Sequence, residues 1–591
     1  MPTRYLDPLL AVPSTIAYGL RTRLKEGYRG ADLRADLMAG LVVGVVALPL
    51  SMALAIASGV APQHGLYTAI IAGVVCSLLG GTQAQVTGPT AAFVVILAPI
   101  AAQFGLGGLL VAGLLAGFIL VGMGLARLGR LISFIPHPVT TGFTAGIAVV
   151  IATIQIKDLL GLRFPGSPES YIERWELMWQ ARATASGWEI LVAAFTFALL
   201  LGLPRVIKKI PAPLLALVGA ALFAVLLQRL VPGFHVDTIG SRFHSLVGGR
   251  EIAGIPPLPP LPILPWHMPG PGGAPLHLDF KTLQALLGPA FAIAMLGAIE
   301  SLLAAVVADG MAGSKHDPNA ELLALGLGNI LCPLFGGIAA TGALARTATN
   351  IRAGARSPIA ATVHALFVLA CTVALAPLVA YLPMAALAAL LLLVAKNMGE
   401  VRHFVHILRV APRSDVAVLI VCFALTVLFD MVLAVSIGVV LASLLFMRRM
   451  AEITDVRLDE GTMARLEVPK GVRLYEVAGP LFFGAAEKAM GIFGEINDRT
   501  TQVVILYLGQ VPAIDATGLV ALESALGKLH RGHIKVILAG LQKQPAAALD
   551  RAGIVRLPGR LAFAPDLDSA LSLAILHAAR IVDTSPPDAG A

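Results

Sequence analysis

The sequence predicts a polytopic α-helical membrane protein that carries a small α/β domain near its C-terminus. Of its 591 residues, 57% are hydrophobic and only 13% are charged, which is about half the charged fraction of a typical soluble domain. The mean hydropathy is +0.83. Apolar runs of spanning length recur from Asp36 to Met447, about fourteen in number, several of them short or interrupted by Gly and Pro. After Met450 the composition becomes that of a soluble domain.

Clusters of Lys and Arg between the apolar runs predict the orientation in the membrane. They occur near the N-terminus and at residues 126–130, 204–209, 401–413 and 447–450. The Pro/Gly-rich loop 231–278 contains only two basic residues, Arg242 and Arg250. Because basic loops stay in the cytoplasm, we expect this loop outside and both termini inside. The net charge of +8 comes with these loops and does not indicate nucleic-acid binding.

Residues 471–580 predict an α/β domain of alternating strands and helices. The segments RLYEVAGPLFF, TQVVILYLG and HIKVILAG are predicted strands, and AAEKAMGIFGEIND and TGLVALESALGKLHR are predicted helices. Residues 1–35 form the expected cytoplasmic N-terminal segment and residues 448–470 the linker. The tail, residues 581–591, has the composition of a disordered segment.

A weak internal repeat links the two halves of the membrane part. CSLLGG (76–81) precedes TGPTAAF (87–93), and CPLFGG (332–337) precedes TGALART (341–347), with an offset of 256 residues at the cysteines and 254 at the threonines. Chance agreement is the alternative in so Gly-rich a chain. Paired, interrupted segments of this kind are typical of inverted-repeat transporters, in which two half-helix N-termini meet near the middle of the bilayer. Such a meeting point favours an anion.

Arg346 lies one turn into the second predicted half-helix. A buried arginine in lipid is costly, so we expect its side chain to face a cavity or a partner. A guanidinium can bind a carboxylate or a sulfate through two parallel hydrogen bonds. A structural salt bridge and a side chain that reaches the membrane interface are the alternatives.

Glu300 lies in the apolar segment AFAIAMLGAIESLL, far from any preceding charge. Ionised and alone it would be strongly unfavourable there, so we expect it to be protonated or paired with Arg346. A carboxyl that exchanges a proton beside an anion site would couple anion loading to protons. A permanent Glu300–Arg346 pair that only holds two helices together is the alternative.

Two prolines accompany the predicted site. TGPT (87–90) places Pro89 near a helix start, where its missing N–H is harmless, with a hydroxyl from Thr90 beside it. A plain helix cap is the alternative. Pro49 lies inside the first predicted span, where it should kink the helix and free a carbonyl for a ligand. A bend without a ligand role is the alternative.

The remaining polar residues predict structural roles. Asp317 or Asn319 should cap the helix that follows KHDPNAE. The four cysteines are scattered singly in apolar runs, where we expect small packing residues rather than disulfides or metal ligands. The sequence shows no metal-ligand spacing, phosphate loop or catalytic constellation. We therefore expect neither an enzyme nor a cofactor or metal, and no ATP-driven transport.

Several segments resemble the SulP anion transporters, the sulfate permease and prestin family. They are LPLSMALAIASGVAPQHGLYTAIIAG (48–73), GPTAAF (88–93), the Glu300 segment, HDPNAELLALGLGNI (316–330) and ATGALARTATN (340–350). The resemblance implies fourteen segments in two inverted seven-segment repeats, divided into core and gate domains. We place the membrane part at residues 36–447, with repeats at about 36–232 and 281–447 around an outer loop at 233–280. The resemblance also implies a homodimer and a cytoplasmic STAS domain.

The resemblance implies roles for individual residues. It places the substrate between the half-helices, and implies that Glu300 is the proton-coupling carboxylate. The implied substrate-binding residues are Gly88, Pro89, Thr90, Ala91, Ala343, Leu344, Ala345 and Arg346, to which we add Pro49. AIDATGLVAL (513–522) resembles the STAS signature turn, where Thr517 stands at a position that is a phosphorylated serine in soluble relatives. A regulatory role for Asp515 and Thr517 and a plain N-cap are both open.

Two departures from the family pattern bear on the substrate. Leu50 stands where sulfate permeases typically carry Gln, and Ala345 stands where they often carry Ser. Both changes remove hydrogen-bonding groups that a small hydrated oxyanion would need, whereas an anion with an apolar middle would not miss them. The chain resembles the DauA-type branch of the family, the bacterial C4-dicarboxylate transporters.

We therefore expect proton-coupled uptake of C4-dicarboxylates (succinate, fumarate, aspartate) across a bacterial inner membrane by alternating access. The alternatives are Na⁺ as coupling ion, sulfate or bicarbonate as substrate on the same fold, and an anion channel or anion-driven conformational device with the STAS domain as output. Besides the anion and the lipid bilayer, we expect a second copy of the chain and a cytosolic protein at the STAS domain as partners, and no nucleic acid.

Overall fold

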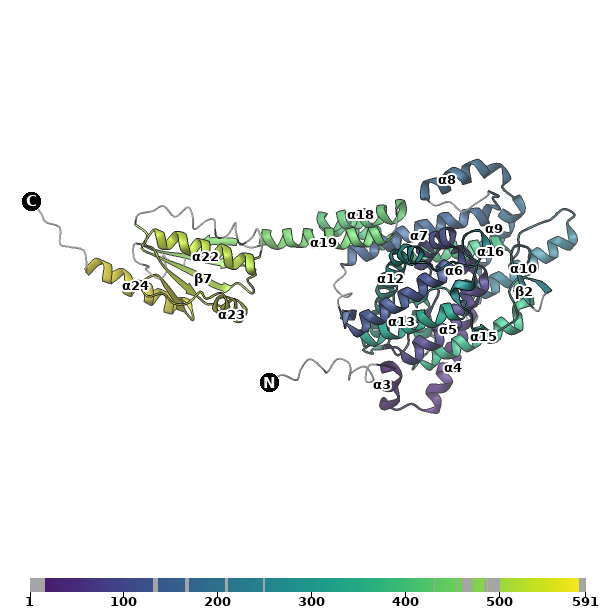
Figure 1. Ribbon diagram of the computed structural model, residues 1–591, viewed down its shortest axis with the longest axis horizontal. Helices are drawn as coiled ribbons and strands as arrows, with labels where there is room; N and C mark the ends of the chain where they lie inside the picture. Colours follow the sequence, from purple (N-terminus) through teal and green to yellow (C-terminus); the bar gives the residue numbers. More distant parts are fainter. Residues whose placement is uncertain are drawn as a thin grey trace, which may run out of the picture. The chain divides into compact units, whose positions relative to one another are not determined.

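The computed structural model describes most of the chain as helices followed by a small sheet (Figure 1). The described residues are 16–130, 136–164, 170–207, 211–247, 250–429, 431–453, 455–459, 468, 471–482, 486, 490 and 500–583. Two compact units divide the chain, Met1–Val439 and Val440–Ala591, with the boundary inside helix α19 (Met431–Ile453). The predicted tail beyond residue 583, and most of the predicted linker and of the predicted helix at 485–498, lie outside the described residues.

The first unit is helical, as predicted. Its helices are α3 (Tyr18–Glu26), α4 (Gly30–Ala57), α5 (Pro62–Leu79), α6 (Ala91–Leu125), α7 (His137–Leu160), α8 (Tyr171–Gln180), α9 (Gly187–Val206), α10 (Ala212–Leu230), α11 (Ile239–Arg242), α12 (Phe280–Ala312), α13 (Pro318–Leu334), α14 (Leu344–Arg352), α15 (Ile359–Val379), α16 (Met384–Met398), α17 (Val401–Val410) and α18 (Arg413–Leu428).

Among the described residues, ten helices are long and apolar enough to cross a membrane. The 35-residue helix α6 bends at Gly105, whose φ of 67° lies in the left-handed region, so α6 is two segments. Three shorter helices, α13, α14 and α18, have 17, 9 and 16 residues. Counting α6 twice and adding these three gives fourteen segments, the number that the sequence predicts.

Local sequence signals account for where these helices start. The carboxylate of Asp317 accepts hydrogen bonds from the backbone N–H groups of Asn319 (2.9 Å) and Ala320 (3.1 Å) ahead of α13, with Pro318 in the first helical position. Of the two caps that the sequence allows here, the structure selects Asp317. Asp279 caps α12 in the same way, accepting from the N–H of Thr282 at 2.7 Å.

The internal repeat is a structural two-fold. Two short strands, β1 (Thr87–Gly88) and β4 (Thr341–Gly342), pair antiparallel, with Thr87 opposite Gly342 and Gly88 opposite Thr341. Adding 254 to the number of Thr87 gives Thr341, and subtracting 254 from the number of Gly342 gives Gly88. The repeat therefore converts the first residue pair into the second. The backbone therefore places the half-helices α6 and α14 tip to tip, as the inverted repeat predicts.

The two repeated cysteines obey the same symmetry. The thiol of Cys76 donates to the carbonyl of Ala324 (3.4 Å), and the thiol of Cys332 donates to the carbonyl of Thr68 (3.9 Å). The offset of 256 residues relates Cys76 to Cys332 and Thr68 to Ala324, so the repeat converts one contact into the other. All four cysteines are buried and unpaired as thiols.

The helices form two packed groups. In one group α6 packs on α12 and α13, α4 packs on α15, and α5 packs between α13 and α15. In the other group α7 packs on α16 and α18, and α9 packs on α10 and α16. Glycines allow close contact between helices: a Cβ on Gly117 of α6 would lie 2.8 Å from the carbonyl oxygen of Gly326 in α13. These groups have the arrangement expected of core and gate domains.

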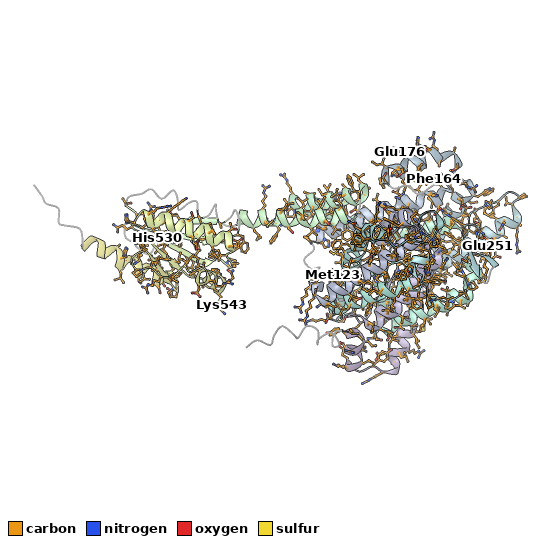
Figure 2. All side chains as sticks on the ribbon, viewed as in Figure 1. Met123, Phe164, Glu176, Glu251, His530 and Lys543 are labelled. Carbon is orange, nitrogen blue, oxygen red and sulfur yellow. The ribbon has the colours of Figure 1, made fainter. Side chains whose placement is uncertain are left out.

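The predicted outer loop, residues 233–280, has structure of its own. Strands β2 (His244–Val247) and β3 (Arg250–Ala253) form an antiparallel hairpin, on which the side chain of Glu251 is exposed (Figure 2). Two short 3₁₀ turns follow, η4 (Pro265–His267) and η5 (Pro271–Gly273). Between them the carbonyl of Pro269 accepts a hydrogen bond from the N–H of Gly107 (2.8 Å), so this loop packs on α6 at its bend.

The second unit contains the predicted α/β domain. Its sheet has the order β5 (Asp455–Leu458), β6 (Val472–Ala478), β7 (Val503–Gln510), β8 (Lys535–Ala539) and β9 (Leu561–Ala564), with β5 antiparallel and the others parallel. Helix α22 (Ala516–Arg531) covers one face (Figure 1) and α24 (Leu567–Asp583) the other, and α23 (Lys543–Arg551) packs into the same hydrophobic core as α22. Three of the predicted strands and one predicted helix are thereby confirmed as β6, β7, β8 and α22.

Candidate functional site

The two half-helix tips open onto a cavity of about 420 Å³ between the two helix groups. On the core side its wall comes from α4, from the starts of α6 and α14, and from α12. On the other side the wall comes from α7, from the end of α16 and from the start of α17. The first N–H groups of α6 and α14 have no partner within their own helices, so both tips present positive dipole ends to the cavity.

Arg346 joins the two half-helices. Its side chain is 3% exposed, and its Nη2 donates a hydrogen bond to the carbonyl of Pro89 at the tip of α6. Its Nη1 is buried and has no hydrogen-bond partner among the residues that the structure describes. A buried guanidinium with a free N–H group can accept an anion as its missing partner.

Gly88 explains how the guanidinium fits against the first strand. A Cβ at this position would lie 2.7 Å from Nη1 and 3.4 Å from Cζ of Arg346. The glycine therefore contacts the site through its backbone and does not line the cavity.

Glu300 lines the same cavity from α12. Its Oε2 accepts a hydrogen bond from the hydroxyl of Thr90, which precedes α6, at 2.8 Å. Between described residues, no ion pair joins Glu300 to Arg346. The direct pairing that the sequence allows is thus absent from this conformation, and the carboxyl faces the cavity with one hydroxyl partner.

The structure brings together most of the predicted site. The predicted residues that line the cavity are Pro89, Thr90, Ala91, Ala343, Leu344, Ala345, Arg346 and Glu300. Pro49 does not belong to this set: it is buried inside α4, which runs as one helix from residue 30 to residue 57, and its neighbour Leu50 faces the cavity instead. The structure therefore does not place Pro49 among the residues that line the cavity, because consecutive helical residues point about 100° apart.

The wall opposite the half-helices was not predicted. Thr140, Thr141 and Thr144 of α7 line it, followed by Asn397 at the end of α16. Thr144 donates its hydroxyl hydrogen to the carbonyl of Thr140 (2.7 Å), as threonine commonly does within helices. The one available signal is HPVTTGFT (137–144), a polar stripe at helical spacing in an otherwise apolar run.

A second buried carboxyl lies near the cavity without lining it. Glu321 of α13 is 2% exposed and accepts hydrogen bonds from Gly81, Thr82 and Gln85. In the sequence it is only an acidic residue in the first turn of a helix, a position that the helix dipole favours anyway. Nothing in the sequence indicates its long-range partners.

In the α/β domain, Asp515 and Thr517 lie at the start of α22. The Oδ1 of Asp515 accepts a hydrogen bond from the N–H of Gly518 at 2.7 Å, so Asp515 is the N-cap. Thr517 is exposed in the first turn. Figure 2 marks the far end of the same helix with His530, and the start of α23 with Lys543.

The described residues contain no group of three or more His, Cys, Asp or Glu side chains that could hold a metal ion. The fold and the cavity instead define a multi-pass membrane transporter with a buried cationic site between two half-helices.

The comparisons with known proteins agree. Residues 33–448 match the model of the Sulfate permease family, and residues 463–570 match the STAS domain. The chain belongs to the Sulfate permease family and carries a STAS domain.

Named relatives are anion transporters. The chain is 40% identical to the "Putative sulfate transporter YvdB" of Bacillus subtilis over 86% of this chain and 91% of that one. It is 27% identical to the "Bicarbonate transporter BicA" of Picosynechococcus sp. over 84% of this chain and 86% of that one. Among solved structures, the murine Slc26a9 anion transporter in the inward-facing state has a TM-score of 0.81 at 18% identity and covers 98% of this chain and 96% of its own. That last likeness concerns the fold alone.

These findings confirm the predicted family, the helical membrane fold with a STAS domain, and a transporter rather than an enzyme.

Proposed function

We propose that the protein is a secondary active transporter that takes up C4-dicarboxylates with protons by alternating access. The observation that carries this proposal is Arg346, whose buried Nη1 lacks a partner at the meeting point of two half-helix N-termini. A carboxylate of the substrate would supply the missing acceptor.

The charge of the site suits a dianion. Each helix N-terminus carries the equivalent of roughly half a positive charge, so two tips and one arginine balance about two negative charges. A dicarboxylate supplies both of these charges. A monoanion would suit the same site with Glu300 ionised.

The apolar part of the cavity wall favours an organic anion. Leu50, Leu54 and Phe143 line the cavity together with Ala345. Carbon atoms between two carboxylates can contact such side chains, whereas a fully hydrated oxyanion would lose water there without replacement. This contrast is the support for a dicarboxylate over an inorganic anion.

Glu300 is the proposed proton carrier. Its carboxyl faces the same cavity as Arg346 and is bonded to Thr90 at the tip of α6. Protonation would remove a negative charge from the cavity and favour entry of an anion. Release of the proton on the cytoplasmic side would then favour exit of the anion. A Na⁺ ion at the same carboxylate is the alternative means of coupling.

A second candidate function is sulfate or bicarbonate transport on the same site. The names of the relatives favour it, since YvdB is described as a putative sulfate transporter and BicA as a bicarbonate transporter. The fold and the role of Arg346 would be unchanged, and only the anion would differ.

We place the protein in a bacterial inner membrane with both termini in the cytoplasm, as a homodimer. Support for the orientation comes from the basic loops. The STAS domain, with the exposed Thr517 at the start of α22, is the proposed contact for a cytosolic partner. Labelling of single cysteines introduced into the outer hairpin and the STAS domain from either side of the membrane tests the orientation, and cross-linking in membranes tests the dimer.

Uptake of labelled succinate into proteoliposomes tests the proposed function, with and without an inward proton gradient and with Na⁺ replaced by choline. Unlabelled fumarate, sulfate and bicarbonate serve as competitors. Gradient-driven succinate uptake that only fumarate blocks is the expected result. Movement of sulfate or bicarbonate without succinate would select the second candidate.

A further inference from the structure

Glu321 is a buried carboxyl whose hydrogen-bond partners among the described residues are all donors. Its Oε2 accepts from the N–H of Gly81 (2.9 Å) and from the hydroxyl of Thr82 (2.8 Å). Its Oε1 accepts from Nε2 of Gln85 (2.8 Å) and, at 3.5 Å, from the hydroxyl of Ser301. Two carboxylate oxygens offer about four lone pairs, so four donors saturate an ionised side chain.

No cation balances this charge directly, since Glu321 forms no ion pair within the part of the chain that the structure describes. When a buried charge is held by hydrogen bonds alone, the loss of any one donor costs free energy, because part of the charge is then left without a partner. The positions of the four donors therefore depend on this carboxylate.

Gln85 connects Glu321 to the segment that precedes the first half-helix. Its Nε2 donates both to Glu321 and to Oγ of Ser301 (2.7 Å), while its Oε1 is buried and has no partner in the described parts of the chain. Turning the amide over would place Oε1 against the carboxylate, so Glu321 selects the amide orientation. Ser301 directly follows Glu300, which ties the same network to the helix of the proposed proton carrier.

The backbone on either side of Gln85 is bonded to the second half-helix. The carbonyl of Ala84 accepts from Asn350 (2.9 Å), and the N–H of Val86 donates to the hydroxyl of Thr347 (3.0 Å). The carbonyl of Val86 accepts from the N–H of Ala343 (2.8 Å). The side chain of Gln85 therefore links Glu321 to the short segment that leads into β1 and on to the Pro89 carbonyl bound by Arg346.

We propose that Glu321 is the positioning residue of the anion site, acting through Gln85 on the residue 84–89 segment and through Ser301 on the helix that carries Glu300. It is not among the residues that line the cavity. The inference rests on the proposed anion site but not on which anion occupies it.

The test is Glu321→Gln in proteoliposomes, with uptake normalised to folded protein. Gln offers one acceptor oxygen in place of two, so either Gln85 and Ser301 or Gly81 and Thr82 lose their acceptor. We expect the KM for the anion to rise about tenfold, the effect of roughly one disturbed hydrogen bond, while the maximal rate per folded transporter stays within about twofold. A purely structural role would lower the amount of folded protein and leave KM unchanged.

The reciprocal swap tests the path through Gln85. In the double variant E321Q/Q85E the amide of residue 321 can donate to a carboxylate at position 85, which restores a donor–acceptor pair. We expect KM to return to within about threefold of the wild-type value. A KM as high as that of E321Q alone would show that Glu321 does not act through Gln85.

Glu189→Gln is the matched control. Glu189 is also a buried carboxyl, 4% exposed, and accepts from the N–H of Asp237 at 2.5 Å, but it lines a different pocket. We expect its KM to equal that of the wild type. An equal rise in both variants would mean that loss of any buried carboxylate disturbs transport, and would overturn the proposal.

The choice of anion keeps this test separate from the proposed function. KM is measured with whichever of succinate, sulfate or bicarbonate the wild-type protein carries, so transport of sulfate alone would refute the dicarboxylate and still test Glu321. If the wild type carries none of these anions, the rate of backbone amide hydrogen exchange tests the proposal instead. Faster exchange at the amides of Val86 and Ala343 in E321Q would support the proposal, and unchanged exchange would overturn it.

Discussion

The α-carbon of Gly88 lies against the guanidinium of Arg346, so closely that a methyl group on Gly88 would fall 2.7 Å from Nη1. These residues are 258 positions apart and come from the two halves of the inverted repeat. Each half thus supplies one component of the site: the first half gives a bare backbone and a carbonyl, and the second gives the cation. Neither half alone would form the proposed anion site.

Gly88→Ala should therefore weaken transport without unfolding the protein. The added methyl group must displace the guanidinium, because the backbone of β1 is fixed by its pairing with β4. We expect uptake at low substrate concentration to fall about tenfold, since a displacement of the order of 1 Å at a binding group costs between ten- and a hundredfold. Gly122→Ala in α6 is the control, because a Cβ there meets no atom within 4 Å. Equal uptake by both variants would contradict the close contact.

Arg346→Lys tests whether the site needs the several fixed N–H donors of a guanidinium or only a positive charge. Lysine keeps the positive charge, but it cannot bond the Pro89 carbonyl and an anion through two fixed N–H groups. We expect about a hundredfold loss in uptake efficiency for Arg346→Lys and a larger loss for Arg346→Ala. Initial rates across a range of substrate concentrations give the measurement. Wild-type uptake by the alanine variant would remove Arg346 from the site.

Glu300→Gln should separate transport from the proton gradient. Glutamine keeps an oxygen that can accept the hydroxyl hydrogen of Thr90 but cannot exchange a proton. We expect exchange of internal for external substrate to persist, while stimulation by an inward proton gradient disappears. Glu176→Gln, on the exposed face of α8 (Figure 2), is the control and should retain the stimulation. Gradient-driven accumulation by the Glu300 variant would assign proton coupling to another group.

Much of this site could be predicted from the sequence because its charges stand alone in apolar segments. Arg346 and Glu300 are conspicuous for that reason, and the repeated Thr-Gly pair indicates where the two halves meet. Glu321 and Thr144 could not be found in the same way. A glutamate in a first helical turn and a threonine bonded to its own helix both have sufficient local explanations, and only long-range contacts distinguish them.

The same limit applies to the fold. The helix count follows from apolar runs, but the bend that divides α6 depends on Gly105 and on its contact with the outer loop, where a Cβ would lie 2.6 Å from Gly270. That run contains several glycines, and nothing local distinguishes the one that bends. Pro49 shows the converse, since a proline inside an apolar run suggested a ligand position although α4 continues through it.

Tyr28→Phe should lower stability near the N-terminus. The hydroxyl of Tyr28 donates to Oδ2 of the fully buried Asp36 at 2.8 Å, and Asp36 also accepts from the N–H groups of Arg356 (2.6 Å) and Ser357 (3.1 Å). Losing one of these donors should cost about 1 kcal/mol, seen as a lower melting temperature in detergent. Tyr381→Phe is the control, because it removes the same hydroxyl group from an exposed tyrosine. Equal melting temperatures for the two variants would contradict a stabilising role for the Tyr28 hydroxyl.

The same tyrosine gives a pH dependence. Burial, and next the hydrogen bond to Asp36, raise the pKa of Tyr28 to about 12 from its ordinary value of 10.0. The folded state therefore holds this proton more tightly than the unfolded state does. Its contribution to stability is complete below pH 10 and is lost as the pH rises from 10 toward 12. The Tyr28→Phe variant should lack that part of the alkaline loss, and an unchanged alkaline profile would contradict the bond.

The last prediction concerns the choice of anion. Leu50 on α4 and Ala345 in the first turn of α14 both face the cavity. Sulfate permeases typically carry Gln at the first of these positions and often carry Ser at the second. The double variant Leu50→Gln, Ala345→Ser adds an amide to the cavity from α4 and a hydroxyl from the first turn of α14, and both can donate to a small oxyanion. We expect succinate uptake to fall and sulfate to become a better competitor by about tenfold, corresponding to one or two added hydrogen bonds. Leu303→Gln supplies the control, because it adds an amide to the same cavity from α12. If it raises sulfate competition equally, polarity alone sets the preference; if neither variant does, residues 50 and 345 do not determine the anion.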